Sequence, residues 1–195
     1  MLPLSSSVIR PNFVAKKIFS SRDILPKDDK NLWKIEQGFV RIVTFHEDGT
    51  IVTLGIWGVG DILGRVLSKT EPYQIECLGK VELSPWQTQD SSQLTQVLQM
   101  YVQQAEELMV IRSHKTVEIM LIKLLEWLAK RFGKEVQQGK LIDLRLTHQD
   151  IADTIGTTRV TVTRILQKLE EQGFIQRLRL QKIVLREEEI WHYEI

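Results

Sequence analysis

One stretch decides the fold of this 195-residue chain: Leu146-Thr-His-Gln-Asp-Ile-Ala-Asp-Thr-Ile-Gly-Thr-Thr-Arg-Val-Thr-Val-Thr-Arg-Ile-Leu-Gln-Lys-Leu-Glu-Glu-Gln-Gly-Phe-Ile-Gln176. Thr147, followed three residues later by Asp150, resembles a capping box in which Asp replaces the usual Glu or Gln. This pair predicts a helix that runs to about Ile155. Gly156 then supplies a turn, so the stretch predicts two short helices joined by a glycine.

The second helix is expected to begin after a cap at Thr157 or Thr158 and to end at Gly173. Its apolar residues repeat at helical spacing and must face a core: Val162, Ile165, Leu166 and Leu169. The other face carries Arg159, Thr163, Arg164 and Gln167. An arginine near a helix N-terminus opposes the helix dipole and contributes little to folding there, so two outward arginines call for a partner. Guanine supplies one, because a guanidinium group pairs bidentately with its O6 and N7 atoms in the major groove.

A β-hairpin is predicted after these helices, because Ile175-Gln-Arg and Lys182-Ile-Val-Leu185 flank a polar segment at residues 178–181. The alternative is that the two arginines are ordinary surface residues of a small helical domain. Two helices, a glycine turn and a hairpin in this order favour a winged helix-turn-helix, which reads DNA.

Residues 24–86 contain short apolar-alternating runs separated by turns, a pattern typical of a small antiparallel barrel or roll. The runs cover residues 31–35, 39–45, 50–57, 73–77 and 80–83. Glu47-Asp-Gly-Thr50 lies between two of them and is a hairpin turn signal.

Residues 91–111 contain no Gly or Pro and carry an apolar stripe at helical spacing, which predicts a helix about 30 Å long. Such a stripe is typical of a coiled-coil seam in a homodimer. The expected dimer contacts are Leu94, Leu98, Tyr101, Ala105 and Leu108. The alternative is that the stripe packs on the chain's own barrel. A further helix is predicted over residues 117–132, and residues 137–140 connect it to the DNA module.

The composition excludes several classes of protein. No run of about 18 apolar residues occurs, and Met1-Leu-Pro-Leu-Ser-Ser-Ser7 has no charged region followed by an apolar one. We therefore expect a cytoplasmic protein with no membrane association. Cys77 is the single cysteine, which excludes an internal disulfide and a cysteine-ligated cluster built from this chain alone. The histidines lack ligand spacing, so no metal or cofactor is expected: His46, His114, His148 and His192.

The net charge of +1 is unevenly distributed along the chain. Residues 1–90 hold 11 basic and 11 acidic side chains, whereas residues 140–182 hold 8 basic and 5 acidic ones. An acidic tail offsets this excess: Glu187, Glu188, Glu189 and Glu194. The positive charge therefore lies with the predicted reading helix, as nucleic-acid binding requires.

Residues 25–185 resemble the cyclic-AMP receptor protein and Fnr group of bacterial transcription regulators, the Crp/Fnr family. In the DNA module the matching residues are Leu146-Thr147, Asp150-Ile151-Ala152, Gly156, Arg159, Thr161-Val162-Thr163-Arg164 and Leu169-Glu170. In the β-region they are Gly38, Asp48-Gly49 and Gly60-Asp61-Ile-Leu-Gly64. The resemblance implies an α+β protein with an N-terminal β-roll similar to a cyclic-nucleotide-binding domain, a long dimerisation helix and a C-terminal winged helix-turn-helix. The implied domains are residues 1–90, 91–113 and 114–195.

The β-region departs from the members that bind cyclic AMP. In those members Gly-Asp-x-x-Gly is followed by Glu, and an Arg-Ser pair binds the cyclic phosphate; here Arg65 follows Gly64, and the next loop has no Arg-Ser. A buried phosphate without its arginine would lack charge-assisted hydrogen bonds of roughly 1.5–3 kcal/mol each. Cyclic AMP is therefore not expected as the effector, and the residues identify no other. Arg65 and Lys69 could form a site for a different anion. The simpler interpretation is that they lie in a solvated loop.

The reading helix also departs from the cyclic-AMP branch, because Val160 stands where many members have a glutamate that contacts cytosine. Valine offers only apolar contact, for example to a thymine methyl group. The resemblance implies that the two arginines read guanines while neighbouring polar residues contact the backbone. The expected DNA-contacting set is Thr147, His148, Gln149, Thr158, Arg159, Val160, Thr161, Thr163, Arg164 and Lys182.

The expected partner is double-stranded DNA with a palindromic operator, bound by a homodimer; RNA polymerase is the candidate protein partner. The alternative is an adaptor module whose β-roll docks another protein, with little specific DNA binding. An enzyme is not expected, because the chain has no Gly-x-Ser-x-Gly, no phosphate-binding Gly-rich loop and no His-Glu-x-x-His. Effector sensing must change the spacing of the two DNA modules in the dimer, since half-sites lie about 34–36 Å apart. The hinge candidate for this movement is Arg112-Ser-His114.

Overall fold

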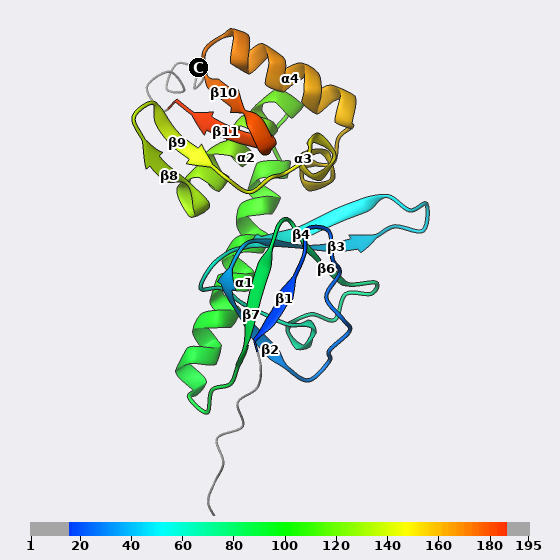
Figure 1. Ribbon diagram of the computed structural model, residues 1–195. Coiled ribbons are helices and arrows are strands. Elements are labelled where there is room, and N and C mark those ends of the chain that lie inside the picture. The colour runs from blue at the N-terminus through cyan, green and yellow to red at the C-terminus, as the bar shows by residue number, and fades with distance from the viewer. Residues whose placement is uncertain (1–15, 187–195) are drawn as a thin grey trace, which may run out of the picture.

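The computed structural model describes residues 16–186, which form a β-roll, two long helices and a C-terminal winged helix-turn-helix module (Figure 1). The expectations for Met1–Ser7 and for the acidic tail from Glu187 onward lie outside the described residues. Within residues 16–186, no helix combines the length and the apolar character needed to cross a bilayer.

Within the described residues 16–90, the β-roll contains seven strands in two antiparallel sheets. The strands are β1 (Lys17–Phe19), β2 (Leu32–Gln37), β3 (Val40–Phe45), β4 (Ile51–Trp57), β5 (Ile62–Leu63), β6 (Gln74–Cys77) and β7 (Val81–Trp86). Their order is β1-β7-β2-β5 in one sheet and β4-β3-β6 in the other. All five predicted runs are confirmed as strands. The sequence missed β1 and β5, because strands of three and two residues are too short to show alternation.

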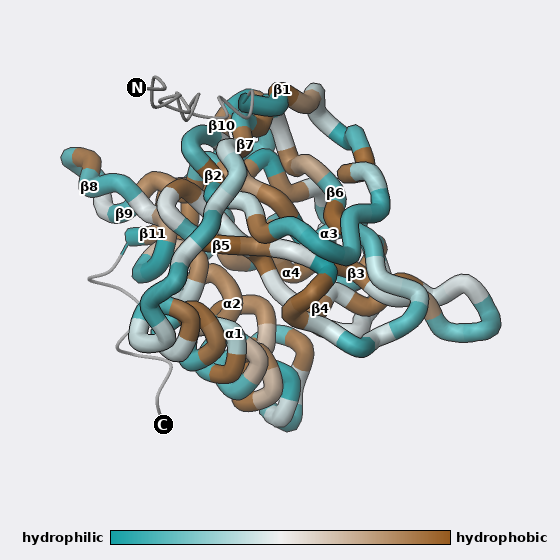
Figure 2. Tube along the Cα trace, turned by 90° about the horizontal axis from the view of Figure 1, so that it is seen from below, coloured by the Kyte–Doolittle hydropathy of each residue, from teal (hydrophilic) through white to brown (hydrophobic). Residues whose placement is uncertain are grey.

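The predicted turn at residues 47–50 joins β3 to β4 as a hairpin. The His46 N–H donates to the Thr50 carbonyl oxygen at 2.9 Å, and Gly49 has a φ of 83°. A positive φ costs glycine little, so this residue allows the tight turn. The tip of the hairpin is polar and projects from the roll (Figure 2).

Two helices follow the roll: α1 (Ser91–Arg112) and α2 (Val117–Phe132). Both are capped by side chains, since the Asp90 carboxylate accepts from the Ser92 N–H and the Thr116 hydroxyl accepts from the Ile119 N–H. Gly133 ends α2, as the sequence predicts. Of the hinge candidate, Arg112 is the last residue of α1, and residues 113–114 lie in the short bend between the helices.

One buried side chain fixes α1 on the roll. Gln104 is 1% exposed, and its amide both donates to the Ile56 carbonyl oxygen at 3.0 Å and accepts from the Ile56 N–H at 2.9 Å. Gly55 leaves room for this contact, because a Cβ there would lie 2.0 Å from Gln104 Oε1.

The winged helix-turn-helix module contains α3 (His148–Ile155), α4 (Arg159–Glu171), β10 (Ile175–Leu178) and β11 (Lys182–Leu185). The predicted two helices and hairpin wing are confirmed. Residues 137–140, expected only as a connection, instead belong to a second hairpin of β8 (Lys134–Val136) and β9 (Gly139–Ile142). This hairpin extends the wing into a sheet of order β10-β11-β9-β8, because β9 pairs with the open edge of β11.

The core is divided between the roll and the helices. One cluster fills the roll around Trp33, Ile35 and Trp57. The other begins at Ile56 and Leu78 of the roll and continues through α1 and α2 into α3, α4 and the wing. The winged helix-turn-helix module therefore shares a core with α1 and α2.

Candidate nucleic-acid interface

The first helix of the motif starts from the capping box predicted by the sequence. The Thr147 hydroxyl accepts from the Asp150 N–H at 3.1 Å, and the Asp150 carboxylate accepts from the Thr147 N–H at 2.7 Å. Gly156 ends the helix with a φ of 70°, in the left-handed region. Asp therefore performs the role of the usual Glu or Gln in this box.

The reading helix α4 is capped by Thr158, one of the two predicted candidates. Its hydroxyl accepts from the Thr161 N–H at 3.2 Å and lies 2.9 Å from the Thr161 hydroxyl. Thr157 lies in the turn, where its N–H donates to the Ala152 carbonyl oxygen. Thr158 therefore begins the helix, and Thr161 lies in its first turn.

The two faces of α4 are separated as the periodicity predicts. Its buried residues are Val162, Ile165, Leu166 and Leu169, and its exposed ones include Arg159, Val160, Thr163, Arg164 and Gln167. Val160 is 78% exposed, an apolar side chain on an otherwise polar surface. Within residues 16–186, no hydrogen bond or ion pair joins the Arg159 or Arg164 guanidinium to another side chain. Both guanidinium groups are therefore available to a partner.

His148 links the first helix to the reading helix. Its Nδ1 lies 2.8 Å from the Thr163 hydroxyl, which donates to the Arg159 carbonyl oxygen at 2.9 Å. Because that hydroxyl proton is engaged, Nδ1 must be the donor, and the neutral ring then carries no proton on Nε2. Burial, together with the charges of Arg177 and Arg159, lowers the pKa of His148 below its ordinary value of 6.5.

Basic residues of the wing differ in whether their charge is already paired within the chain. Lys182, an expected phosphate contact, forms an ion pair with Asp143 at 2.8 Å. Arg177, on β10, is paired with Glu170 of α4. Arg179 is exposed at the wing turn, and no partner is found for its side chain within the described part of the chain. The sequence did not single out Arg179, because the wing's tip becomes evident only once β10 and β11 are paired.

One cavity of the β-roll lies beside Arg65, which the sequence offered as part of an anion site. The cavity beside Gly64 and Arg65 has a volume of about 30 Å³, enough for about one or two water molecules. Arg65 is paired with Asp29 at 3.3 Å and with Glu71, and it lies over the Tyr73 ring. Two carboxylates therefore already neutralise the arginine that the sequence offered as an anion site.

The exposed face of α1 differs from the predicted seam. Tyr101 packs against Trp57, with ring centroids 5.0 Å apart, and Leu108 is 1% exposed. Leu108 therefore faces the chain's own core and is too buried to be a dimer contact, which corrects that assignment, whereas Tyr101 packs on the roll and is only partly buried. The sequence missed this because two neighbouring apolar stripes share the same spacing. Leu94, Leu98 and Ala105 are exposed as expected, and the same face adds Val102 and Met109.

Comparison with known proteins places this architecture among transcription regulators. Residues 121–189 match the Crp-like helix-turn-helix domain. Over 163 residues the chain is 38% identical to the regulatory protein CysR of Synechococcus elongatus, a match that covers 82% of this chain and 79% of that protein. Over 72 residues it is 42% identical to the global nitrogen regulator of a Nostoc species, covering 37% of this chain and 32% of that protein.

Two solved structures have the same fold. FixK2 from Bradyrhizobium japonicum matches with a TM-score of 0.75 at 21% identity, covering 91% of this chain and 95% of that chain. TTHB099 from Thermus thermophilus matches with a TM-score of 0.70 at 21% identity, covering 88% of this chain and 92% of that chain.

Proposed function

Since this chain belongs to the Crp/Fnr family of DNA-binding transcription regulators, we propose that it binds a palindromic operator as a homodimer and does so without cyclic AMP. The observation that carries this proposal is the pair of exposed arginines on α4, Arg159 and Arg164, whose guanidinium groups have no side-chain partner within residues 16–186. We further propose that it acts in the cytoplasm, without catalysis, and that RNA polymerase is its protein partner.

Base reading is assigned to three residues of α4. Arg159 and Arg164 suit guanine, because each can donate two parallel hydrogen bonds to the O6 and N7 atoms. Val160 suits a thymine methyl group, since its exposed side chain can offer apolar contact only. Thr147, His148 and Gln149 on the first helix, with Thr158, Thr161 and Thr163, are the proposed contacts to the DNA backbone.

The homodimer is supported by the exposed apolar stripe on α1. The stripe consists of Leu94, Leu98, Val102, Ala105 and Met109, which are spaced by three or four residues. A solvent-exposed stripe of this kind on a helix of 22 residues is typical of a two-helix seam. A two-fold pair also presents two reading helices to half-sites about one turn of DNA apart, roughly 34–36 Å.

Independence from cyclic AMP is supported by the roll. Its cavity beside Gly64 is far smaller than the roughly 300 Å³ of the smallest typical ligand pockets. Arg65 is held by Asp29 and Glu71, and no Arg-Ser pair follows to bind a cyclic phosphate.

The test is fluorescence anisotropy of the effector-free protein on a palindromic family-type operator and on scrambled DNA of equal length, at one stated salt concentration. We expect selective operator binding that added cyclic AMP does not change. Light scattering on the same sample checks the dimer. Equal weak binding to both DNAs by an intact dimer, followed by selection from random DNA that yields no preferred sequence, would favour the protein-binding adaptor instead.

A further inference from the structure

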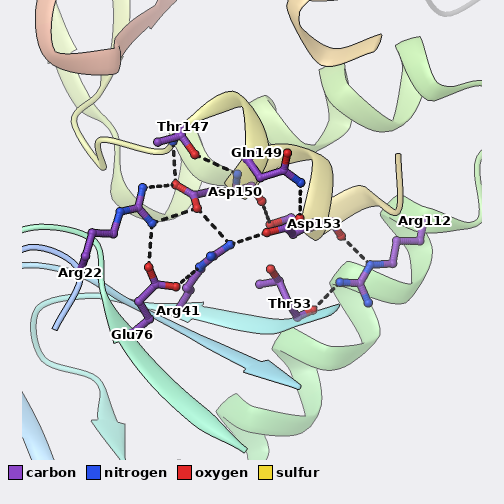
Figure 3. A network of polar contacts seen from close by, with 10 residues as sticks. Arg22, Arg41, Thr53, Glu76, Arg112, Thr147, Gln149, Asp150 and Asp153 are labelled. Carbon is purple, nitrogen blue, oxygen red and sulfur yellow. Dashed lines mark hydrogen bonds and ion pairs between the residues drawn. The ribbon is translucent and has the colours of Figure 1, made fainter. Parts of the chain in front are cut away.

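A network of ion pairs joins the β-roll to the first helix of the DNA-binding module (Figure 3). Arg41 on β3 is 5% exposed, and its guanidinium binds both carboxylates of α3, Asp153 at 3.0 Å and Asp150 at 3.1 Å. The same group donates to Glu76 of β6 at 2.7 Å. The roll thus holds α3 through a buried cation with three anionic partners.

Arg22 forms the second connection between the two parts. It donates to the two oxygens of Asp150 at 3.0 and 2.7 Å, and to Glu76 at 2.9 Å. Burial alone would raise the pKa of Asp150, but the Arg22 hydrogen bond, the Arg41 charge and the Thr147 N–H lower it below its ordinary value. The carboxylate is therefore ionised at neutral pH and fully engaged. We call Arg22, Arg41, Asp150 and Asp153 the ionic clamp.

The clamp reaches residues that are proposed to touch DNA phosphates. The Oδ2 atom of Asp150 accepts from both Arg22 and the Thr147 N–H. The Asp153 carboxylate accepts from the Gln149 amide at 2.7 Å. Arg112 adds a third tie at the hinge, because it donates to the Thr154 carbonyl oxygen of α3 at 2.7 Å and to the Thr53 carbonyl oxygen of β4. Each contact fixes the orientation of α3 on the roll.

The docked arrangement leaves the reading face uncovered. The clamp uses the side of α3 that carries Asp150 and Asp153, whereas Arg159, Val160 and Arg164 on α4 remain exposed. The contact therefore does not bury the surface that reads bases. A buried ion pair also resists displacement of either partner, since separating the two leaves an uncompensated buried charge.

We propose that Arg22 and Arg41 are positioning residues for operator binding, which hold α3 and the reading helix in one orientation through Asp150 and Asp153 without an effector. This inference rests on the proposed operator binding by a homodimer. Fixed orientation matters because both reading helices must enter the groove at the half-site spacing.

The first test measures operator and scrambled-DNA affinity for the full-length dimer carrying Arg22→Gln, Arg41→Gln or Asp153→Asn. Lys34→Gln, which removes a half-exposed cation from β2, is the control. We expect each clamp variant to bind the operator about tenfold more weakly, within the range typical of coupled sites, with a smaller change on scrambled DNA. The double variant Arg41→Gln/Asp153→Asn should lose less than the sum of the two single variants, because both remove the same contact.

A second measurement reports orientation without DNA. A spin label on Glu171→Cys, at the end of α4, gives the distance between the two reading helices of a dimer by pulsed electron paramagnetic resonance. Burial raises the pKa of the native Cys77 thiol to about 12, so the introduced cysteine is labelled selectively. We expect one narrow distance distribution in the unsubstituted clamp and a broad one in each clamp variant.

The outcomes separate this inference from the proposed function. If the wild-type dimer binds no operator, the proposed function fails. The distance distributions alone then show whether the clamp fixes the orientation of the two α4 helices. Clamp variants that bind the operator as tightly as the control, or more tightly, overturn the positioning role; so do unchanged distance distributions. Should Arg41→Gln fail to fold, the half-exposed Arg22 and the isosteric Asp153→Asn still give the answer.

Discussion

The Nδ1 atom of His148 lies 2.8 Å from the hydroxyl of Thr163, and this contact joins the helix proposed to meet phosphates to the helix proposed to read bases. In the free protein the ring is held neutral, because burial and the charges of Arg177 and Arg159 lower its pKa. Nε2 of the neutral ring is an acceptor, so the ring must take up a proton there before it can donate to an anion.

We expect operator affinity to rise as the pH falls from about 7.5 to about 6, by at most about tenfold per pH unit for one linked proton. A phosphate beside His148 raises the pKa of the ring in the complex, so binding takes up a proton. Stability changes in the opposite sense: the lowered pKa stabilises the free fold above pH 6.5, and this contribution is lost as the pH falls. Anisotropy titrations across this range measure the affinity. His148→Gln should remove most of the pH dependence, and an unchanged profile in that variant would contradict the phosphate contact.

Arg164→Ala should weaken operator binding by roughly 1–3 kcal/mol and relax the preference for one base pair. The reason is that Arg164 is exposed on the reading face and has no side-chain partner within residues 16–186, so its loss removes a base contact and little else. Competition assays with operators changed at single positions measure the effect. Lys69→Ala, which removes an exposed cation from the roll, is the matched control. Equal loss on operator and scrambled DNA would refute the base-reading role.

Lys182→Ala should flatten the salt dependence of DNA binding by about one counterion per half-site, on operator and scrambled DNA alike. Asp143→Asn should do the reverse and tighten binding, because it releases Lys182 from its ion pair and removes a negative charge from the wing. Affinity measured over a series of salt concentrations gives both slopes. A Lys182→Ala protein with the wild-type slope would remove this residue from the interface, leaving Arg179 as the wing's phosphate contact.

Leu98→Glu should convert the dimer to a monomer, since it places two like charges against each other in the exposed stripe of α1. The dissociation constant of the proposed dimer should rise by at least about tenfold, with the fold of each chain retained. Leu108→Glu should instead unfold the chain, because that side chain is 1% exposed in the chain's own core. Sedimentation and circular dichroism distinguish the two results, and Gln99→Glu on the same helix is the control. A dimeric Leu98→Glu protein would place the interface elsewhere.

Gln104→Leu should lower the free energy of unfolding by roughly 1–3 kcal/mol for each of the two backbone groups of Ile56 that it leaves unpaired. Urea unfolding followed by tryptophan fluorescence measures the loss. Gln103→Leu, one residue away and exposed, should change stability by about 0.5 kcal/mol or less. Similar losses in both variants would mean that the buried amide does not fix α1 on the roll.

Local signals explain what the sequence predicts well. The capping box at Thr147, the turn at Gly156 and the apolar residues of α4 act within a few residues of one another, so each helix could be placed to within about one residue. The hairpin turn at residues 47–50 and the end of α2 at Gly133 are of the same kind.

The errors arise where short elements or shared spacing hide the pattern. β8 and β9 are strands of three and four residues that pair with each other, and β9 also pairs with β11, more than 40 residues away. On α1 the stripe that faces the roll and the stripe that faces solvent have the same spacing, so Tyr101 and Leu108 could not be assigned from periodicity alone.

The sequence by itself determined the reading motif, its exposed arginines and the order of roll, helix and winged helix, because these depend on capping, turn chemistry and helical periodicity. Only the tertiary structure decided how the motif is held. Arg22 and Asp150 are separated by 128 residues and Arg41 and Asp153 by 112, and nothing in either segment indicates its partner. Ion pairs carry no sequence periodicity, so their selection depends on the packing that brings buried charges together.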